Sequence, residues 1–209
     1  MHFDFDLLYA DDSLLVVDKP AGLLAVPGLG EAGADNLTTR LQRSHPDART
    51  VHRLDMATSG LMLMARGADM QRALSRLFEQ RAVHKGYEAI VEGTLIQQAG
   101  WIDAPLAADW PQRPRQKVDL VHGKHALTRW QLAPGPAPER GTRLQLEPVT
   151  GRTHQLRVHL MSIGHPICGD TLYGSQPERY SRMLLHACEL RFTHPLNGRH
   201  CHFSSATPF

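Results

Sequence analysis

The chain of 209 residues can form one large domain or two small ones, and its 42% hydrophobic and 21% charged residues are typical of a soluble globular protein. No apolar run is long enough for a membrane-spanning helix, which excludes an integral helical membrane protein. The formal net charge of +2 is too small to indicate a nucleic-acid partner by itself.

The first residues and the cysteines indicate a reducing compartment. The sequence MHFDFDLLYADD carries acidic residues where an export signal would carry basic ones. Cys168, Cys188 and Cys201 are odd in number and lack C-x-x-C spacing, which argues against a disulfide framework. We therefore expect the cytoplasm.

The first third of the chain predicts two strands, a helix and a buried strand. Residues 7–18 alternate around Asp-Asp-Ser like two short strands with a turn, and residues 20–28 are too rich in Pro and Gly for a regular element. Asp35 or Asn36 can cap a helix. Leu61–Ala65 contains no charge, which predicts a strand buried on both faces.

The rest of the chain predicts two helices among several strands. A helix capped by Asp69 carries apolar residues at helical spacing, namely Met70, Ala73, Leu74, Leu77 and Phe78. A second helix runs from Thr153 with Leu156, Leu160 and Ile163 on one face and Gly164 as its C-cap. Strands are expected at 87–91, 126–132, 143–149, 183–192 and 199–204, and a surface loop at 133–141.

These elements predict an α+β fold in one domain, residues 1–209. Strands outnumber helices without strict alternation, so we expect a mixed, mostly antiparallel sheet with flanking helices and a central catalytic cleft.

Basic residues gather in the middle of the chain. Between Arg113 and Arg129 there are five Lys or Arg and two His against one acid, Asp119. This stretch can follow an RNA backbone through Arg113, Arg115, Lys117 and Lys124. The alternative is a strand pair with ordinary surface charges.

The sequence lacks the residues that several common types of catalytic or cofactor-binding site require. There is no phosphate-binding loop, no G-x-G-x-x-G after a strand and no G-x-S-x-G elbow, so we expect no nucleotide cofactor. His200 and His202, with His186 and Cys188, do not have the paired spacing of structural zinc sites, so we expect no metal.

Asp55 stands out because it follows His52 and Arg53 and precedes the uncharged strand. It can simply cap the following turn, with Arg53 as its ion-pair partner. It can also act as a nucleophile or general base, which requires a cation that keeps it ionised. Arg157 is a candidate, because it lies one turn after His154 and off the apolar face of the predicted helix.

Five segments in register resemble the successive motifs of the RluA family of RNA pseudouridine synthases. They are HRLDMATSG (52–60), KGYEAIVEG (85–93), GRTHQLRVHL (151–160), GHPICGDTLYG (164–174) and LLHA (184–187). The resemblance covers nearly the whole chain and is strongest to the short members that lack an amino-terminal S4 RNA-binding domain. Cys168 stands where an aliphatic residue is commoner, a change that a buried thiol can absorb.

The resemblance implies isomerisation of selected uridines without a cofactor. By the family pattern Asp55 is the essential carboxylate near the sugar, acting either on the anomeric carbon or by removing a sugar proton. Tyr87 is the active-site tyrosine and Arg157 the basic residue paired with the aspartate. Leu185 lies under the uracil ring, and Arg53 takes the vacated place in the RNA stack.

The remaining candidates are substrate contacts. His52 and His154 are expected to bind substrate, and Arg152 can meet a phosphate or simply be exposed. By pattern alone Tyr87 is also a half-buried strand aromatic and Leu185 a core residue.

The expected protein is a metal-free monomer that acts on structured loops of ribosomal RNA, transfer RNA or both. Two rivals are an RNA-binding protein without activity and a glycosylase or hydrolase that releases uracil through the same aspartate. The products separate the three: pseudouridine, unchanged uridine or free uracil.

Overall fold

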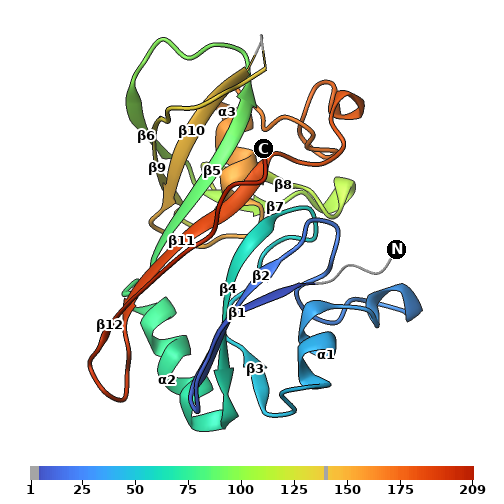
Figure 1. The fold of residues 1–209 in the computed structure, drawn as a ribbon. Coiled ribbons are helices and arrows are strands. Elements are labelled where there is room, and N and C mark those ends of the chain that lie inside the picture. Colours follow the sequence, from blue (N-terminus) through green and yellow to red (C-terminus); the bar gives the residue numbers. More distant parts are fainter. Residues whose placement is uncertain (1–4, 139–140) are drawn as a thin grey trace. The chain divides into compact units, whose positions relative to one another are not determined.

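The computed structural model describes residues 5–138 and 141–209, which form two compact units. Unit 1 contains the described part of Met1–Lys85 together with Ala187–Pro208, and unit 2 contains that of Gly86–His186 together with Phe209. Figure 1 shows the elements along the chain. The expected α+β class with a mixed, mostly antiparallel sheet is confirmed. The single catalytic domain and its central cleft stay predictions.

Unit 1 is a sheet with two helices. Its strands are β1 (Asp6–Ala10), β2 (Leu14–Lys19), β3 (Ala48–Thr50), β4 (Ser59–Arg66), β11 (Leu185–Thr193, from Ala187 on) and β12 (His200–Ser204). They are ordered β1-β2-β4-β11-β12, and β3 pairs with β4. The helices are α1 (Leu37–Gln42) and α2 (Gly67–Glu79), after the short 3-10 helix η1 (Glu31–Gly33).

The core of unit 1 lies around β4. Leu61–Ala65 is fully buried, as its lack of charge predicts. Leu14 and Val16 of β2, and Met70 and Leu74 of α2, pack in the same apolar cluster. The helical spacing of α2 therefore reflects its packing against the sheet (Figure 1).

Gly60 at the start of β4 sits where the neighbouring backbone comes very close. Its φ of +114° is one that side chains rarely adopt, and an added Cβ would lie 2.3 Å from the carbonyl oxygen of Ala187. Only glycine fits between β4 and the Ala187 backbone in unit 1.

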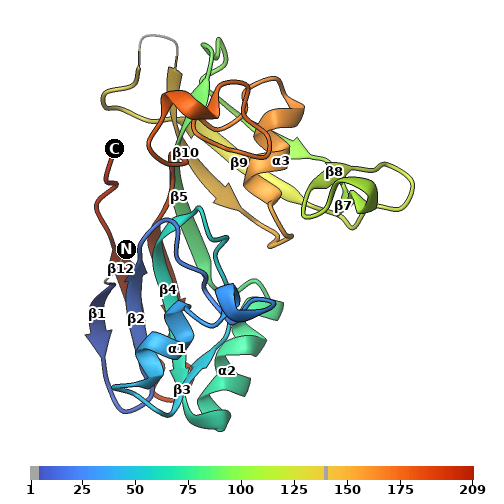
Figure 2. The same ribbon diagram turned by 90° about the vertical axis from the view of Figure 1, so that its right-hand side faces the viewer.

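Unit 2 contains a row of antiparallel strands, the helix α3 and a small hairpin. The strands β5 (His84–Glu92), β10 (Gly141–Pro148), β9 (Leu127–Leu132) and β6 (Ala99–Asp103) follow one another in this order, each antiparallel to the next. The helix α3 (Gln155–Ser162) lies beside the hairpin of β7 (Leu106–Ala108) and β8 (Gln116–Val118), as Figure 2 shows. The 3-10 helices are η2 (Trp110–Gln112) and η3 (Pro177–Arg179).

Local contacts shift the expected helix starts. Helix α2 begins at Gly67, so Asp69 is not its cap but lies in the first turn, where it pairs with Arg72. Helix α3 begins at Gln155 rather than Thr153, because His154 adopts a left-handed conformation with φ of +54°. Asn36 is the cap of α1, one of the two residues that the sequence allowed.

Some expectations about faces and short strands are wrong. Ile163, expected on the buried face with Leu156 and Leu160, is 39% exposed and lies beyond the last turn of α3. The short strands β3, β6, β7 and β8 were not expected from the sequence. The surface loop at 133–141 contains residues 139–140, which lie outside the described residues.

Within the described ranges, no helix combines the length and apolar character needed to cross a membrane.

We expect Gly60→Ala to cost at least about 2 kcal/mol more free energy of unfolding than Gly67→Ala. Both glycines have positive φ, but a Cβ on Gly67 meets nothing within 4 Å, so it carries only the conformational strain. Urea denaturation of the two variants measures the difference. Equal losses would show that the approach of Ala187 does not constrain the strand.

Candidate functional site

The segment that carries Asp55 lies in unit 1 between β3 and β4. The Thr58 amide donates a hydrogen bond to the Asp55 carbonyl oxygen (3.1 Å), which forms a turn. Leu54 is buried, Arg53 is exposed, and Asp55 is half-buried. The buried Leu54 thus anchors a segment whose two charged residues reach the surface of the unit.

His52 fastens this segment to β4. Its Nε2 accepts a hydrogen bond from the Leu63 amide (2.9 Å), and its ring stacks on Phe78 of α2 with centroids 4.5 Å apart. Burial, and then the positive charge of Lys85, lower the pKa of His52 from 6.5 to about 3. A neutral imidazole is the form that accepts the Leu63 hydrogen bond. His52 therefore has a structural role, and its expected contact with substrate stays a prediction.

Lys19 fixes the backbone next to Asp55. Its side chain is fully buried, and Nζ donates to the carbonyl oxygens of Pro20 (2.8 Å), Leu23 (2.8 Å) and Met56 (3.2 Å). The Gly22 amide also donates to the Met56 carbonyl (2.8 Å). Three carbonyl acceptors compensate an ammonium group removed from water. The loop after β2 and the Asp55 segment are thereby held together.

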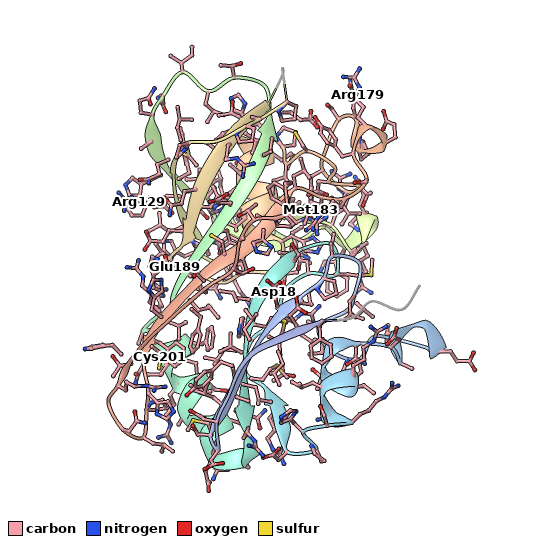
Figure 3. All side chains as sticks on the ribbon, viewed as in Figure 1. Asp18, Arg129, Arg179, Met183, Glu189 and Cys201 are labelled. Carbon is pink, nitrogen blue, oxygen red and sulfur yellow. The ribbon has the colours of Figure 1, made fainter. Side chains whose placement is uncertain are left out.

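Glu189 contacts one histidine near the end of the chain, His202, and a second histidine, His84. The carboxylate of Glu189 on β11 lies 2.8 Å from His202 Nε2 and 3.2 Å from His84 Nε2, while Cys201 between the two histidines of β12 is buried (Figure 3). Among residues 5–138 and 141–209, no group of three or more His, Cys, Asp or Glu is arranged to hold a metal ion.

Tyr87 and Leu185 belong to unit 2. Tyr87 is half-buried in β5 and lies opposite Leu146 of β10. Leu185 is buried at the start of β11. The carbonyl oxygen of the preceding Leu184 accepts a hydrogen bond from the Ile90 amide (3.1 Å), and the Leu184 amide donates to the Cys168 carbonyl (2.9 Å). Both positions are therefore set by strand pairing rather than by a loop.

The turn before α3 is held by one buried amide side chain. Gln155 accepts hydrogen bonds from the Thr150 hydroxyl (2.7 Å) and the Arg152 amide (3.0 Å), and it donates to the Leu127 carbonyl (3.0 Å) and the Thr128 hydroxyl (3.0 Å). This clamp leaves Arg152 exposed, where its Nε donates to the His125 carbonyl (3.0 Å).

Arg157 on α3 forms a buried ion pair with Asp170. Its Nε lies 2.7 Å from Oδ2 and its Nη2 2.7 Å from Oδ1, and the side chains are 5% and 0% exposed. The amides of Leu172 (2.9 Å) and Tyr173 (3.2 Å) donate to Oδ1 as well. The sequence suggested Asp55 as the carboxylate partner and did not identify Asp170. The bidentate geometry fixes the plane of the guanidinium.

Tyr173 brings together three groups that the sequence singled out. Its hydroxyl lies 2.8 Å from His154 Nδ1, and the guanidinium carbons of Arg157 and Arg115 each lie 5.1 Å from its ring centroid. Burial raises the pKa of the Tyr173 hydroxyl, so it stays protonated.

The basic residues of the middle stretch lie on and around the β7–β8 hairpin. Arg113, Lys117 and Lys124 are exposed, whereas Arg115 is half-buried against Tyr173. The Arg113 guanidinium lies 3.5 Å from the ring centroid of Trp110, which is itself exposed. An exposed aromatic stacked on a cation is a surface suited to nucleic acid.

The sequence reasoning missed Lys19, Gln155, Asp170 and Tyr173. Gln155, Asp170 and Tyr173 lie within segments already quoted for the family resemblance, so proximity to the motifs was the available signal for these three, whereas Lys19 lies outside all five segments. Nothing local revealed their partners. Asp55 belongs to unit 1, whereas Tyr87, Arg157 and Leu185 belong to unit 2, so their meeting in one site stays a prediction.

Comparisons with known proteins give one consistent result. A family model described as RNA pseudouridylate synthase matches residues 13–162. A Yersinia pestis protein named "Dual-specificity RNA pseudouridine synthase RluA" is 46% identical over 206 residues, which are 97% of this chain and 99% of that protein. The Vibrio cholerae protein of the same name is 47% identical over 193 residues, which are 91% of this chain and 78% of that protein.

Two solved structures resemble the whole chain. "Human RNA Pseudouridylate Synthase Domain Containing 1" is 28% identical with a TM-score of 0.82, covering 99% of this chain and 84% of that chain. "Human RNA Pseudouridylate Synthase Domain Containing 4" is 26% identical with a TM-score of 0.75, covering 97% and 88%.

We expect His52→Gln to flatten the loss of stability at acidic pH. A histidine whose pKa falls from 6.5 to about 3 on folding is neutral in both states above pH 6.5, but between pH 6.5 and 3 only the unfolded chain binds the proton. The free energy of unfolding of the parent protein should therefore decrease as the pH falls from 6.5 towards 3. Plotted against pH, it should have a steeper slope than that of the variant, by the amount that corresponds to about one additional proton bound on unfolding.

Urea denaturation at several pH values between 7.5 and 4.5 gives both slopes. His200→Gln, at an exposed position of β12, is the matched control and should keep the parent slope. Parallel curves for the parent and His52→Gln would show that His52 titrates as an ordinary histidine.

Proposed function

We propose that this chain, which belongs to the RNA pseudouridylate synthase family, acts on selected uridines in structured loops. The premise of the proposal is that membership of this family makes the chain an RNA-modifying isomerase. The observation that supports this most is the match to relatives along nearly their whole length. Those relatives are named dual-specificity enzymes, so we extend the proposal to ribosomal RNA, transfer RNA or both. We propose further that it works in the cytoplasm as a metal-free monomer without a cofactor.

In the proposed mechanism Asp55 acts on the sugar of the target uridine. The bond between the ribose carbon and the ring nitrogen breaks, the uracil turns, and a bond forms to the fifth ring carbon, which then loses its proton. Asp55 either attacks the anomeric carbon or removes a sugar proton to give a glycal. Both routes need the carboxylate ionised and fixed. The contacts of His52 and Lys19, which hold the backbone on both sides of Asp55, support this assignment.

Arg157 is the proposed cation that keeps Asp55 ionised. A carboxylate in a site from which water is excluded would otherwise take up a proton and lose its basicity. The ion pair with Asp170 supports this role, because two hydrogen bonds from Nε and Nη2 fix the direction of the guanidinium plane.

Tyr87 and Leu185 are the proposed walls around the uracil. A detached uracil must rotate without escaping or meeting water, which requires an aromatic face and an apolar floor. Their positions in paired strands support this proposal, because strand residues hold a pocket more firmly than loop residues do.

The RNA contacts are proposed for the exposed cations. Arg53, which is exposed, is proposed to stack where the target base was, since extruding a base costs a few kcal/mol of stacking that a guanidinium plane offsets. We propose that the RNA phosphates bind to the exposed Arg113, Lys117 and Lys124 and to the half-buried Arg115. Arg152, His154 and His52 are proposed to bind the substrate strand. Phosphate contacts set affinity rather than the choice of uridine.

We expect the purified protein to release tritium from ribosomal or transfer RNA labelled on the fifth carbon of uracil, without added metal or nucleotide. Asp55→Asn should abolish the release, because an amide cannot serve as the nucleophile or base. Asp69→Asn, which removes an exposed carboxylate of α2, is the matched control and should keep full activity.

The products decide between this function and its rivals. Pseudouridine supports the proposal, unchanged uridine favours an RNA-binding protein without activity, and free uracil favours a glycosylase or hydrolase. Release by Asp55→Asn at the parent rate would refute the assignment of Asp55.

Arg53→Ala should lower turnover on a folded stem-loop by about tenfold or more and affect a short unstructured oligonucleotide much less. Only the folded substrate has a stack that must be filled when the base leaves. Arg72→Ala on the exposed side of α2 is the control for loss of one surface cation. The same loss on both substrates would count against base extrusion.

A further inference from the structure

Tyr173 connects three parts of unit 2 through one side chain. The Gln116 amide at the start of β8 donates a hydrogen bond to its hydroxyl (2.7 Å), and the same hydroxyl bonds to His154 Nδ1 (2.8 Å) before α3. The rings of Tyr173 and His154 meet edge to face at 5.7 Å. With two polar partners on the hydroxyl, the ring cannot turn out of its plane without losing a hydrogen bond.

Two guanidinium groups share the ring of Tyr173. Arg157 and Arg115 each lie 5.1 Å from the ring centroid, within the range of a cation–π interaction. Arg157 is the cation proposed to face Asp55, and Arg115 belongs to the basic residues proposed to meet phosphate. The ring of Tyr173 therefore contacts both the arginine proposed to act in catalysis, Arg157, and an arginine proposed to contact RNA, Arg115.

Asp170 ties the backbone of Tyr173 to the same arginine. Its Oδ1 accepts hydrogen bonds from both Arg157 Nη2 (2.7 Å) and the Tyr173 amide (3.2 Å). A shift of the Tyr173 backbone would therefore also displace the Asp170 carboxylate, which orients Arg157.

We propose that Tyr173 is a positioning residue through which the β7–β8 hairpin controls the placement of the Arg157 guanidinium when RNA binds. The proposal rests on the proposed function, because it assumes that Arg115 meets RNA and that Arg157 acts at Asp55. Two like charges near one ring repel each other. A phosphate that binds Arg115 neutralises one of them, so the ring then holds Arg157 more firmly.

A simpler role for Tyr173 is core packing with Leu106, Ala126 and Val158. Core packing predicts a loss of stability and of the fraction of folded enzyme. It does not predict that the effect of a hairpin cation on turnover depends on the tyrosine hydroxyl. A double-mutant cycle between Arg115 and Tyr173 separates the two roles.

Tyr173→Phe keeps the ring and removes only the two hydrogen bonds of the hydroxyl. We expect kcat for tritium release to fall by about tenfold with KM changed by less than about twofold, because the placement of Arg157 suffers and RNA binding does not. Tyr9→Phe is the matched control. The Tyr9 hydroxyl also has two hydrogen-bond partners, Asp11 and Arg199, and the Arg199 guanidinium lies 5.9 Å from the Tyr9 ring centroid. All three residues belong to unit 1.

Arg115→Lys tests the same link at the half-buried position directly before β8. Lysine keeps the charge for phosphate but lacks the planar group that stacks on the ring. We expect it to lower kcat several-fold in the parent protein and by a much smaller factor in Tyr173→Phe, where the ring remains but its hydroxyl no longer bonds to the Gln116 amide.

Three results are decisive. If the parent protein releases tritium and Asp55→Asn does not, but Tyr173→Phe keeps the parent kcat, the inference is overturned. It is also overturned if Arg115→Lys lowers kcat by the same factor with and without the Tyr173 hydroxyl. If the parent protein releases no tritium at all, the proposed function fails and not this link.

Discussion

The buried ion pair between Arg157 and Asp170 is the interaction on which the described part of the site in unit 2 depends. Removing a guanidinium and a carboxylate from water costs several kcal/mol for each ion, and their attraction repays this only when the geometry is good and the remaining polar atoms are satisfied. Here the pair is bidentate, and two backbone amides also donate to Asp170. Because such pairs contribute little net stability, what this one provides is a fixed direction for Arg157.

Lys19 solves the corresponding problem in unit 1 with backbone carbonyls instead of a carboxylate. Three carbonyl oxygens surround its ammonium, and one of them belongs to Met56, directly after Asp55. His52 holds the other side of the same segment through the Leu63 amide. The side chain of Met56 is nonetheless 53% exposed and Arg53 is exposed too, so a rigid backbone presents its side chains outward.

Local patterns were enough to predict the elements but not the partners of buried charges. The uncharged run of β4 and the helical spacing of α2 are properties of neighbouring residues, and both predictions are confirmed. Asp170 lies thirteen residues from Arg157 and Lys19 lies thirty-seven from Met56, so no periodicity relates them. His154, whose left-handed conformation moves the start of α3, contacts Tyr173 nineteen residues away, a separation that no local pattern displays.

The family resemblance identified the residues by motif, whereas the structure adds how they are supported. Asp55, Arg157 and Leu185 each stand beside a buried or paired neighbour that restricts their backbone, whereas the cations Arg113, Lys117 and Lys124 are exposed. This division matches the two tasks proposed for these residues. Bond breaking requires groups fixed to a fraction of an ångström, and fixed groups need interior contacts. Phosphate attraction acts over several ångströms and tolerates mobile side chains, so those residues need only lie on the surface.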